Sequence, residues 1–83
     1  MKSVRIEPVN AAGKTLFAID VVCDCGRNGL EKVETGDMSF RHLAGVGASH
    51  TAPYTLRCTC GRTYQVASQV NHIHVHQLDH TGR

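Results

Sequence analysis

The chain has 83 residues, of which 41% are hydrophobic and only 5% aromatic, and its formal net charge is +2. These values exclude a disordered chain and a large multidomain protein. They leave a core of Val, Ile, Leu and Ala whose stability is marginal without an additional cross-link such as a bound metal ion. If the four cysteines bound one divalent ion as thiolates, the net charge would fall close to zero, which excludes a polyanion binder that works through bulk charge.

The N-terminal part of the chain predicts two strands. Val4 and Ile6 alternate with charged residues, which indicates a half-buried strand that ends near Pro8. Residues 10–14 have the composition of a turn, and residues 16–22 are almost continuously apolar, as in a central strand.

No apolar signal-peptide core precedes these strands, and no segment is long and apolar enough to span a bilayer. We therefore expect a cytoplasmic protein that does not associate with membranes. In that compartment thiols stay reduced.

A hairpin is expected next. The dipeptide Asn28-Gly29 is a strong hairpin signal, and residues 30–35 would form the return strand. The strands on either side of it would then lie next to each other.

The segment from Asp37 to Pro53 reads as an insertion that begins with a short helix. Asp37 can cap a helix over residues 38–44, and Gly45 would end it. Residues 46–52 are rich in small side chains and predict a mobile surface loop. One side of the helix would carry Phe40, Leu43 and Ala44.

The C-terminal half predicts further strands. Residues 54–57 lead into a cysteine pair and residues 62–67 lead out of it, so the two halves of the chain form a weak internal repeat of strand, cysteine pair and strand. The repeat predicts a strand before and after each pair.

The apolar face then changes parity along the chain. It falls on even positions at Tyr64 and Val66 but on odd positions at Ile73 and Val75. Because side chains alternate with a period of two along a strand, one straight strand cannot hold both sets. We therefore predict a turn or bulge within residues 68–71.

All four cysteines lie in two near-copies of one motif, Cys23-Asp24-Cys25-Gly26-Arg27 and Cys58-Thr59-Cys60-Gly61-Arg62. Two pairs of soft thiolate ligands suit a tetrahedral zinc ion. The glycine after each pair would let the backbone turn and aim N–H groups at the sulfurs, and the arginines would offset the charge of the site. We predict one structural zinc ion bound by Cys23, Cys25, Cys58 and Cys60.

Two alternatives to zinc remain. Four cysteines could form two disulfides, although a reducing compartment favours a metal site. A tetrahedral sulfur site would also accept iron.

With these motifs the chain resembles the zinc ribbons, in which two cysteine knuckles pinch one ion between them. The knuckles here have one residue between their cysteines, where the usual ribbon has two. The resemblance implies a mainly β fold, a small antiparallel sheet of about five or six short strands with one helix or loop insertion between the knuckles. It implies no particular activity.

Three histidines alternate along the last predicted strand, at His72, His74 and His76, and would project from one face. They could be the solvated face of an edge strand, a surface that binds a partner, or ligands of a second, catalytic metal. In the last case His80, His42 or His50 could add a ligand.

The basic residues are unevenly distributed. The chain from residue 41 onward carries four arginines and a single acidic residue, together with all six histidines. A modest basic face built from Arg41, Arg57 and Arg62 could contact nucleic acid, weakly because few aromatic residues are available for stacking.

We expect one zinc-stapled domain over residues 1–83, with residues 77–83 as a tail. We predict that it is a small non-enzymatic adaptor that docks on a protein partner within a larger assembly. The alternatives are a nucleic-acid-binding or transcription-associated module, and a metal-dependent enzyme that uses the histidine strand. The sequence does not indicate the oligomeric state.

Overall fold

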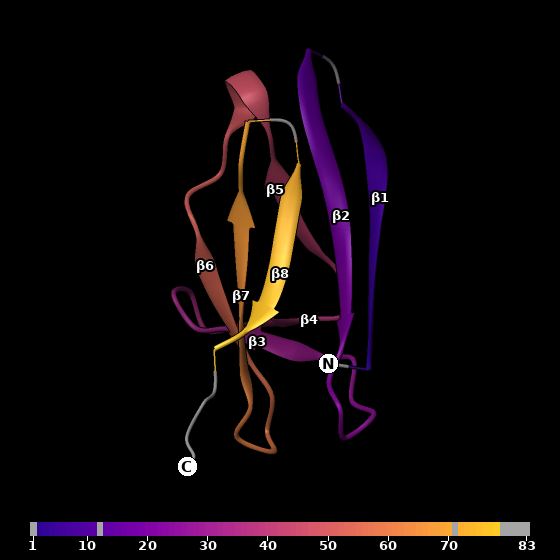
Figure 1. The fold of residues 1–83 in the computed structure, drawn as a ribbon, viewed down its shortest axis with the longest axis vertical. Helices are drawn as coiled ribbons and strands as arrows, with labels where there is room; N and C mark the ends of the chain where they lie inside the picture. Colours follow the sequence, from indigo (N-terminus) through magenta and orange to yellow (C-terminus); the bar gives the residue numbers. More distant parts are fainter. Residues whose placement is uncertain (1, 12, 71, 79–83) are drawn as a thin grey trace.

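The computed structural model describes residues 2–11, 13–70 and 72–78. These residues form an elongated two-layer structure with dimensions of 42 × 23 × 20 Å (Figure 1). Within them lie eight strands and one 3₁₀ turn: β1 (Ser3–Ala11), β2 (Lys14–Val22), β3 (Leu30–Lys32), β4 (Asp37–Ser39), β5 (His42–Gly45), η1 (Gly47–Ser49), β6 (Tyr54–Arg57), β7 (Thr63–Ser68) and β8 (Ile73–Gln77). The predicted mainly β class is confirmed, with more strands than expected. The described residues contain no helix long and apolar enough to cross a membrane.

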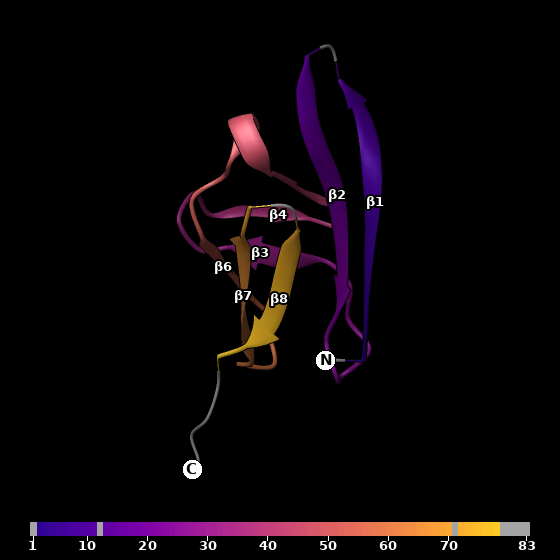
Figure 2. The same ribbon diagram turned by 45° about the horizontal axis from the view of Figure 1, so that its top comes forward.

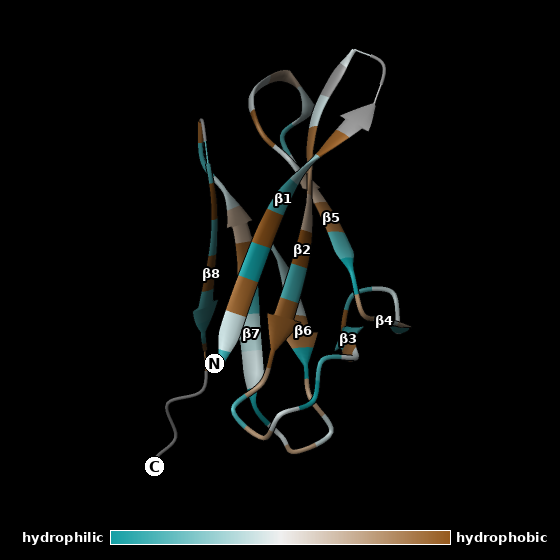
Figure 3. Cartoon of the chain, turned by 90° about the vertical axis from the view of Figure 1, so that its right-hand side faces the viewer, coloured by the Kyte–Doolittle hydropathy of each residue, from teal (hydrophilic) through white to brown (hydrophobic). Residues whose placement is uncertain are grey.

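The first layer is a three-stranded antiparallel sheet in the order β1-β2-β5. Hydrophobic and hydrophilic bands alternate along β1 (Figure 3). This strand was predicted to end near Pro8, but it continues to Ala11, with Pro8 opposite Phe17. An edge strand tolerates proline because the N–H groups on its outer side form no hydrogen bonds to another strand. The predicted turn at residues 10–14 is tighter than expected, with Gly13 at φ 70° and Ala12 outside the described residues.

The second layer is a five-stranded antiparallel sheet in the order β4-β3-β6-β7-β8. Strand β3 pairs with β4 and β6 and not with β2. The hairpin predicted at Asn28-Gly29 is therefore wrong, because the chain leaves β2, turns at the first cysteine pair and crosses into the other sheet. Figure 2 shows β3 and β4 running across the direction of β2. The return strand is also shorter than predicted and ends at Lys32.

The helix predicted over residues 38–44 is wrong. This segment forms β4, which pairs with β3, and β5, which pairs with β2. The burial of His42 and Ala44 and the exposure of Leu43 between them follow the period of a strand. Asp37 therefore caps no helix. The only helical turn among the described residues is η1, inside the predicted loop at residues 46–52.

The hydrophobic core fills the space between the two sheets, as in other two-layer β folds. Tyr64 and Val66 of β7 and Ile73 of β8 all face this core, which confirms the predicted change of parity. The turn that allows it follows Ser68, where the Gln69 N–H donates to the His72 carbonyl. The core cluster contains Ile19, Val21, Cys23, Leu30, Ala44, Val46, Tyr54, Leu56, Cys58, Tyr64, Val66 and Ile73.

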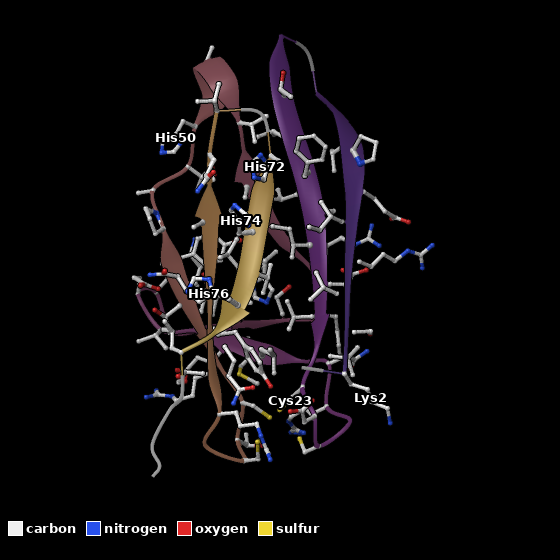
Figure 4. The ribbon with its side chains drawn as sticks, in the orientation of Figure 1. Lys2, Cys23, His50, His72, His74 and His76 are labelled. Atoms are coloured by element: carbon white, nitrogen blue, oxygen red, sulfur yellow. The ribbon has the colours of Figure 1, made fainter. Side chains whose placement is uncertain are left out.

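Two side chains tie the layers together at β5. The Tyr54 hydroxyl of β6 donates to the Leu43 carbonyl at 3.1 Å, and the Ser68 hydroxyl of β7 donates to the Gly45 carbonyl at 2.7 Å. Gly45 also sits so close to η1 that a Cβ there would overlap the Ser49 carbonyl oxygen. These contacts fix one end of the molecule. The four cysteines lie toward the other end (Figure 1 and Figure 4).

Candidate metal centre

The two cysteine motifs fold into nearly identical backbone knuckles. In the first, the Cys23 N–H donates to the Arg27 carbonyl at 2.9 Å and the Gly26 N–H to the Cys23 carbonyl at 2.8 Å; the corresponding bonds in the second knuckle are both 2.9 Å. Gly26 has φ 94° and Gly61 φ 101°, conformations that L side chains rarely adopt. The predicted role of each glycine in turning the backbone is confirmed.

The knuckles bring the four sulfur atoms together. All four lie within 4.8 Å of one another, and the Sγ atoms of Cys23 and Cys60, like those of Cys25 and Cys58, are 3.5 Å apart. Four sulfurs at about 2.3 Å from one tetrahedral ion would be about 3.8 Å apart. The arrangement therefore fits one metal ion, plausibly zinc. None of the four cysteines forms a disulfide.

The first cysteine of each pair belongs to the core and the second to the surface. Cys23 and Cys58 are 0% and 1% exposed, whereas Cys25 and Cys60 are exposed. Both knuckle loops lie at one end of the sheets, where Figure 4 labels Cys23. A bound ion would therefore have the hydrophobic core on one side and solvent on the other.

Main-chain N–H groups favour thiolates at this site. Hydrogen bonds from the Arg62 N–H and from its side chain lower the pKa of Cys60 to about 6. Burial raises the pKa of Cys23, but hydrogen bonds from the Cys25 N–H and the Tyr64 hydroxyl outweigh it, so that the pKa is lowered. Burial raises the pKa of Cys58 to about 12 without a metal. A positive ion would favour the thiolate at this last position, since a coordinating thiol is deprotonated outright.

Two further side chains contact the sulfurs. The Tyr64 hydroxyl lies 3.2 Å from the Cys23 sulfur, and an Arg62 guanidinium nitrogen lies 3.4 Å from that of Cys60. Arg62 is also 3.8 Å from Asp24 of the other knuckle. The charge compensation predicted for the arginines thus holds for Arg62. Arg27 instead lines a pocket beside β4.

Tyr64 was not anticipated as part of this site. It follows Cys60 by four residues, and the apolar alternation placed it on the inner face of β7. The available signal was that a tyrosine on a buried face needs a partner for its hydroxyl. A sulfur at the end of the same core is that partner.

The histidines separate into three environments. His72 and His74 have Nε2 atoms 2.9 Å apart, and His76 is exposed one step further along β8 (Figure 4). His42 lies on β5, opposite Ile19 of β2. It is buried, with an exposed fraction of 7%, and its Nε2 has no hydrogen-bond partner among the described residues. His50 is exposed after η1, and His80 lies outside the described residues. Among residues 2–11, 13–70 and 72–78, the four cysteines alone place three or more possible ligands within reach of one ion.

The three arginines proposed for a basic face all have acidic partners. Arg41 bonds to Asp20 and approaches Glu7, with the pKa of Arg41 raised mainly by the hydrogen bond to Asp20. The other two pairs are Arg57 with Glu31 at 2.8 Å and Arg62 with Asp24. Contact with nucleic acid stays a prediction for all three residues.

The predicted tail at residues 77–83 begins inside the sheet. Gln77 is the last residue of β8, and the Leu78 N–H donates to the Thr63 carbonyl at 2.9 Å. The remainder of the tail lies outside the described residues.

A shallow pocket beside the first knuckle was also not anticipated. It measures ≈ 190 Å³ and is lined by Arg27, Asn28, Gly29, Met38, Ser39 and Phe40. Met38 and Phe40 are 56% and 67% exposed, and the Phe40 ring lies over Gly29, where a Cβ would meet it at 3.2 Å. The predicted helix had placed Phe40 on one side together with Leu43 and Ala44, so no local pattern indicated a pocket here.

Comparisons of the chain with protein-family models, with curated proteins and with solved structures found no match. The likeness to zinc ribbons therefore rests on the cysteine motifs, and membership of that family stays a prediction. The cysteine cluster itself is compatible with a zinc-binding module.

Proposed function

We propose that this protein is a small non-enzymatic adaptor, stapled by one zinc ion on its four cysteines, that binds a segment of a partner protein beside the first knuckle. The observation that supports the proposal is the pair of exposed apolar side chains, Met38 and Phe40, at the rim of a pocket on an edge strand. Both belong to the insertion between the two knuckles.

Strand β4 can extend its sheet. Among the described strands it is the last on its side and pairs with β3 alone, which would leave the other side of its backbone to a further strand. An extended peptide that adds to a sheet edge gains main-chain hydrogen bonds, and pockets next to that edge select its side chains. The short length of β4 limits unwanted pairing with other sheets.

The chemistry of the pocket defines the partner segment. Met38, Phe40 and Gly29 offer an apolar surface, and the Arg27 side chain forms no hydrogen bond or ion pair with any residue that the structure describes. This combination suits an extended segment with an apolar side chain next to a carboxylate. A pocket of ≈ 190 Å³ is smaller than the roughly 300–1,000 Å³ typical of small-molecule sites, which favours a side chain over a substrate.

The metal would serve this surface indirectly. Asn28 and Gly29 follow the first knuckle directly, so ligation of Cys23 and Cys25 would fix one wall of the pocket. Thiolate ligation also requires a reducing compartment, consistent with the cytoplasm.

The proposal can be tested by panning a random peptide display library on the zinc-loaded protein. We expect enrichment of peptides in which an apolar residue neighbours Asp or Glu. Phe40→Ser and Arg27→Glu should each weaken binding of an enriched peptide, whereas Val70→Ser should not. Val70 is a matched control because it is 77% exposed and lies at the turn before β8.

Two results would overturn the proposal. One is an enriched peptide that binds wild type and Phe40→Ser equally, and the other is a library that yields no peptide at all. An oligonucleotide titration of the same samples covers the main alternative, because affinity that falls steeply between low and physiological salt would instead identify a nucleic-acid-binding module.

A further inference from the structure

The pair of histidines at the start of β8 forms a preorganised contact that the zinc site and the pocket do not use. The Nε2 atoms of His72 and His74 are 2.9 Å apart, with ring centroids at 4.4 Å and an angle of 72° between the rings. Both side chains are exposed, and β8 is the outermost strand of its sheet (Figure 4). The two ring nitrogens therefore converge on one point at the surface.

Each Nε2 atom of a neutral imidazole carries either a proton or a lone pair, depending on the tautomer. A neutral imidazole has one N–H and one acceptor nitrogen, so one Nε2–H can donate to the other Nε2. The pair then shares a single proton. When the ring that carries this proton shifts to its Nδ1–H tautomer, both Nε2 lone pairs become available to a metal ion, and the two side chains already converge.

The distance favours one kind of ion. Two nitrogens at about 2.0–2.1 Å from a metal and at right angles to each other are about 2.9 Å apart, whereas tetrahedral angles would place them at about 3.4 Å. Right angles belong to the tetragonal and octahedral geometries of Cu²⁺ and Ni²⁺, for which imidazole is a suitable ligand.

The surroundings leave the other coordination positions to water. Opposite the histidine face of β8, Ala67 pairs with His74 and Gln65 with His76. Neither is charged. The described residues place no third His, Cys, Asp or Glu ligand within reach of this pair.

We propose that His72 and His74 form a surface site for a tetragonal divalent transition-metal ion, Cu²⁺ or Ni²⁺, that binds both Nε2 atoms and completes its shell with water. The site is independent of the cysteine centre, which supplies thiolates in a half-buried cage. It is open, with two protein ligands.

Ni²⁺ is the appropriate probe, since Cu²⁺ would also react with the cysteine thiols. Untagged, zinc-loaded protein would be titrated with NiCl₂ by calorimetry and by two-dimensional NMR, with zinc content measured before and after to show that the knuckles keep their ion. We expect one Ni²⁺ per chain, with paramagnetic broadening centred on the amides of residues 72–75.

The variants separate this site from other histidines. Replacement of a residue that only hydrogen-bonds to a metal ligand costs about 10–100-fold in metal affinity. Loss of a ligand itself, in His72→Asn or His74→Asn, should therefore weaken Ni²⁺ binding by at least about tenfold. His50→Asn is the matched control, because His50 is also exposed but lies after η1. It should leave the affinity unchanged.

Three outcomes would overturn the inference: Ni²⁺ affinity unchanged in His72→Asn, broadening centred away from β8, or no binding by wild type in the millimolar range. Because both residues are on the surface, their replacement should leave the NMR spectrum of the rest of the domain intact.

Discussion

Tyr64 donates its hydroxyl hydrogen bond to the sulfur of Cys23, 41 positions earlier in the chain, at 3.2 Å. Cys23 belongs to the first knuckle and directly follows β2, whereas Tyr64 lies on β7 of the other sheet, and both are 0% exposed. The contact therefore joins the cysteine cluster to the hydrophobic core. It also provides a way to perturb one ligand without removing it.

Replacement of Tyr64 by Phe should change the electronic structure of the metal site. Without the hydrogen bond the Cys23 thiolate becomes a better electron donor, so the thiolate-to-metal charge-transfer band of the cobalt-substituted protein should move to lower energy. Tyr54→Phe is the control, since its hydroxyl bonds to the Leu43 carbonyl and not to a sulfur. An identical band in wild type and Tyr64→Phe would contradict the contact.

Removal of the metal should unfold the protein. Two of the ligands belong to the core cluster, and structural zinc supplies on the order of 10 kcal/mol of folding free energy in small domains. A chelator with reductant present should therefore abolish the dispersed amide spectrum, and added zinc should restore it. Cys60→Ser should behave like the chelated protein, whereas Thr59→Ser, in the same knuckle, should fold. A chelated wild-type sample that keeps its spectrum would refute this prediction.

Gly13 and Gly61 should differ in how well they tolerate a side chain. Gly61 at φ 101° lies beyond the left-handed helical region, whereas Gly13 at φ 70° lies at its edge, and neither has an atom within 4 Å of an added Cβ. Gly61→Ala should cost about 1–3 kcal/mol in unfolding free energy, and Gly13→Ala should cost less. Denaturant titrations of the zinc-loaded proteins give both values. Equal costs would mean that the knuckle does not need its backbone conformation.

His42 should make stability depend on pH. Burial lowers the pKa of His42 below its usual 6.5, with Lys32 adding to the shift and Asp20 and the Ser39 backbone opposing it. The unfolded chain then takes up a proton near pH 6.5 while the folded protein does not, so stability present above pH 6.5 is lost as the pH falls below it.

The difference between wild type and His42→Phe isolates this effect. Protonation of the cysteine ligands is common to both proteins and cancels in the comparison of their unfolding free energies. Relative to wild type, His42→Phe should gain stability from pH 7.5 to 5.5. A constant difference across that range would show that His42 has the same pKa in the folded and unfolded states.

The fold was predictable where the side-chain pattern was local. The strands around the second knuckle, the turn after Ser68 and the exposed histidine face all follow from an alternation that one stretch of sequence contains. The clustering of the four cysteines was equally clear, because a repeated cysteine pair indicates a shared metal site.

The errors arose where pairing partners are distant in sequence. Residues 38–44 have a plausible helical pattern, but two separate strands, β3 and β2, recruit its two ends into different sheets. Asn28-Gly29 signals a hairpin locally, yet β3 finds its partners in β4 and β6. The pocket at Phe40 depends on both of these pairings, and no local pattern contains it.

The crossing of the chain at the first knuckle has a consequence for how the molecule opens. Cys23 and Cys25 sit where β2 of one layer passes into β3 of the other, while Cys58 and Cys60 lie between two strands of the second layer. A metal ion bound by all four cysteines would therefore link both layers, and loss of that ion should let the two layers unfold in one cooperative step. After removal of the ion, the backbone amide hydrogens of β2 and of β7 should therefore exchange with deuterium at equal rates.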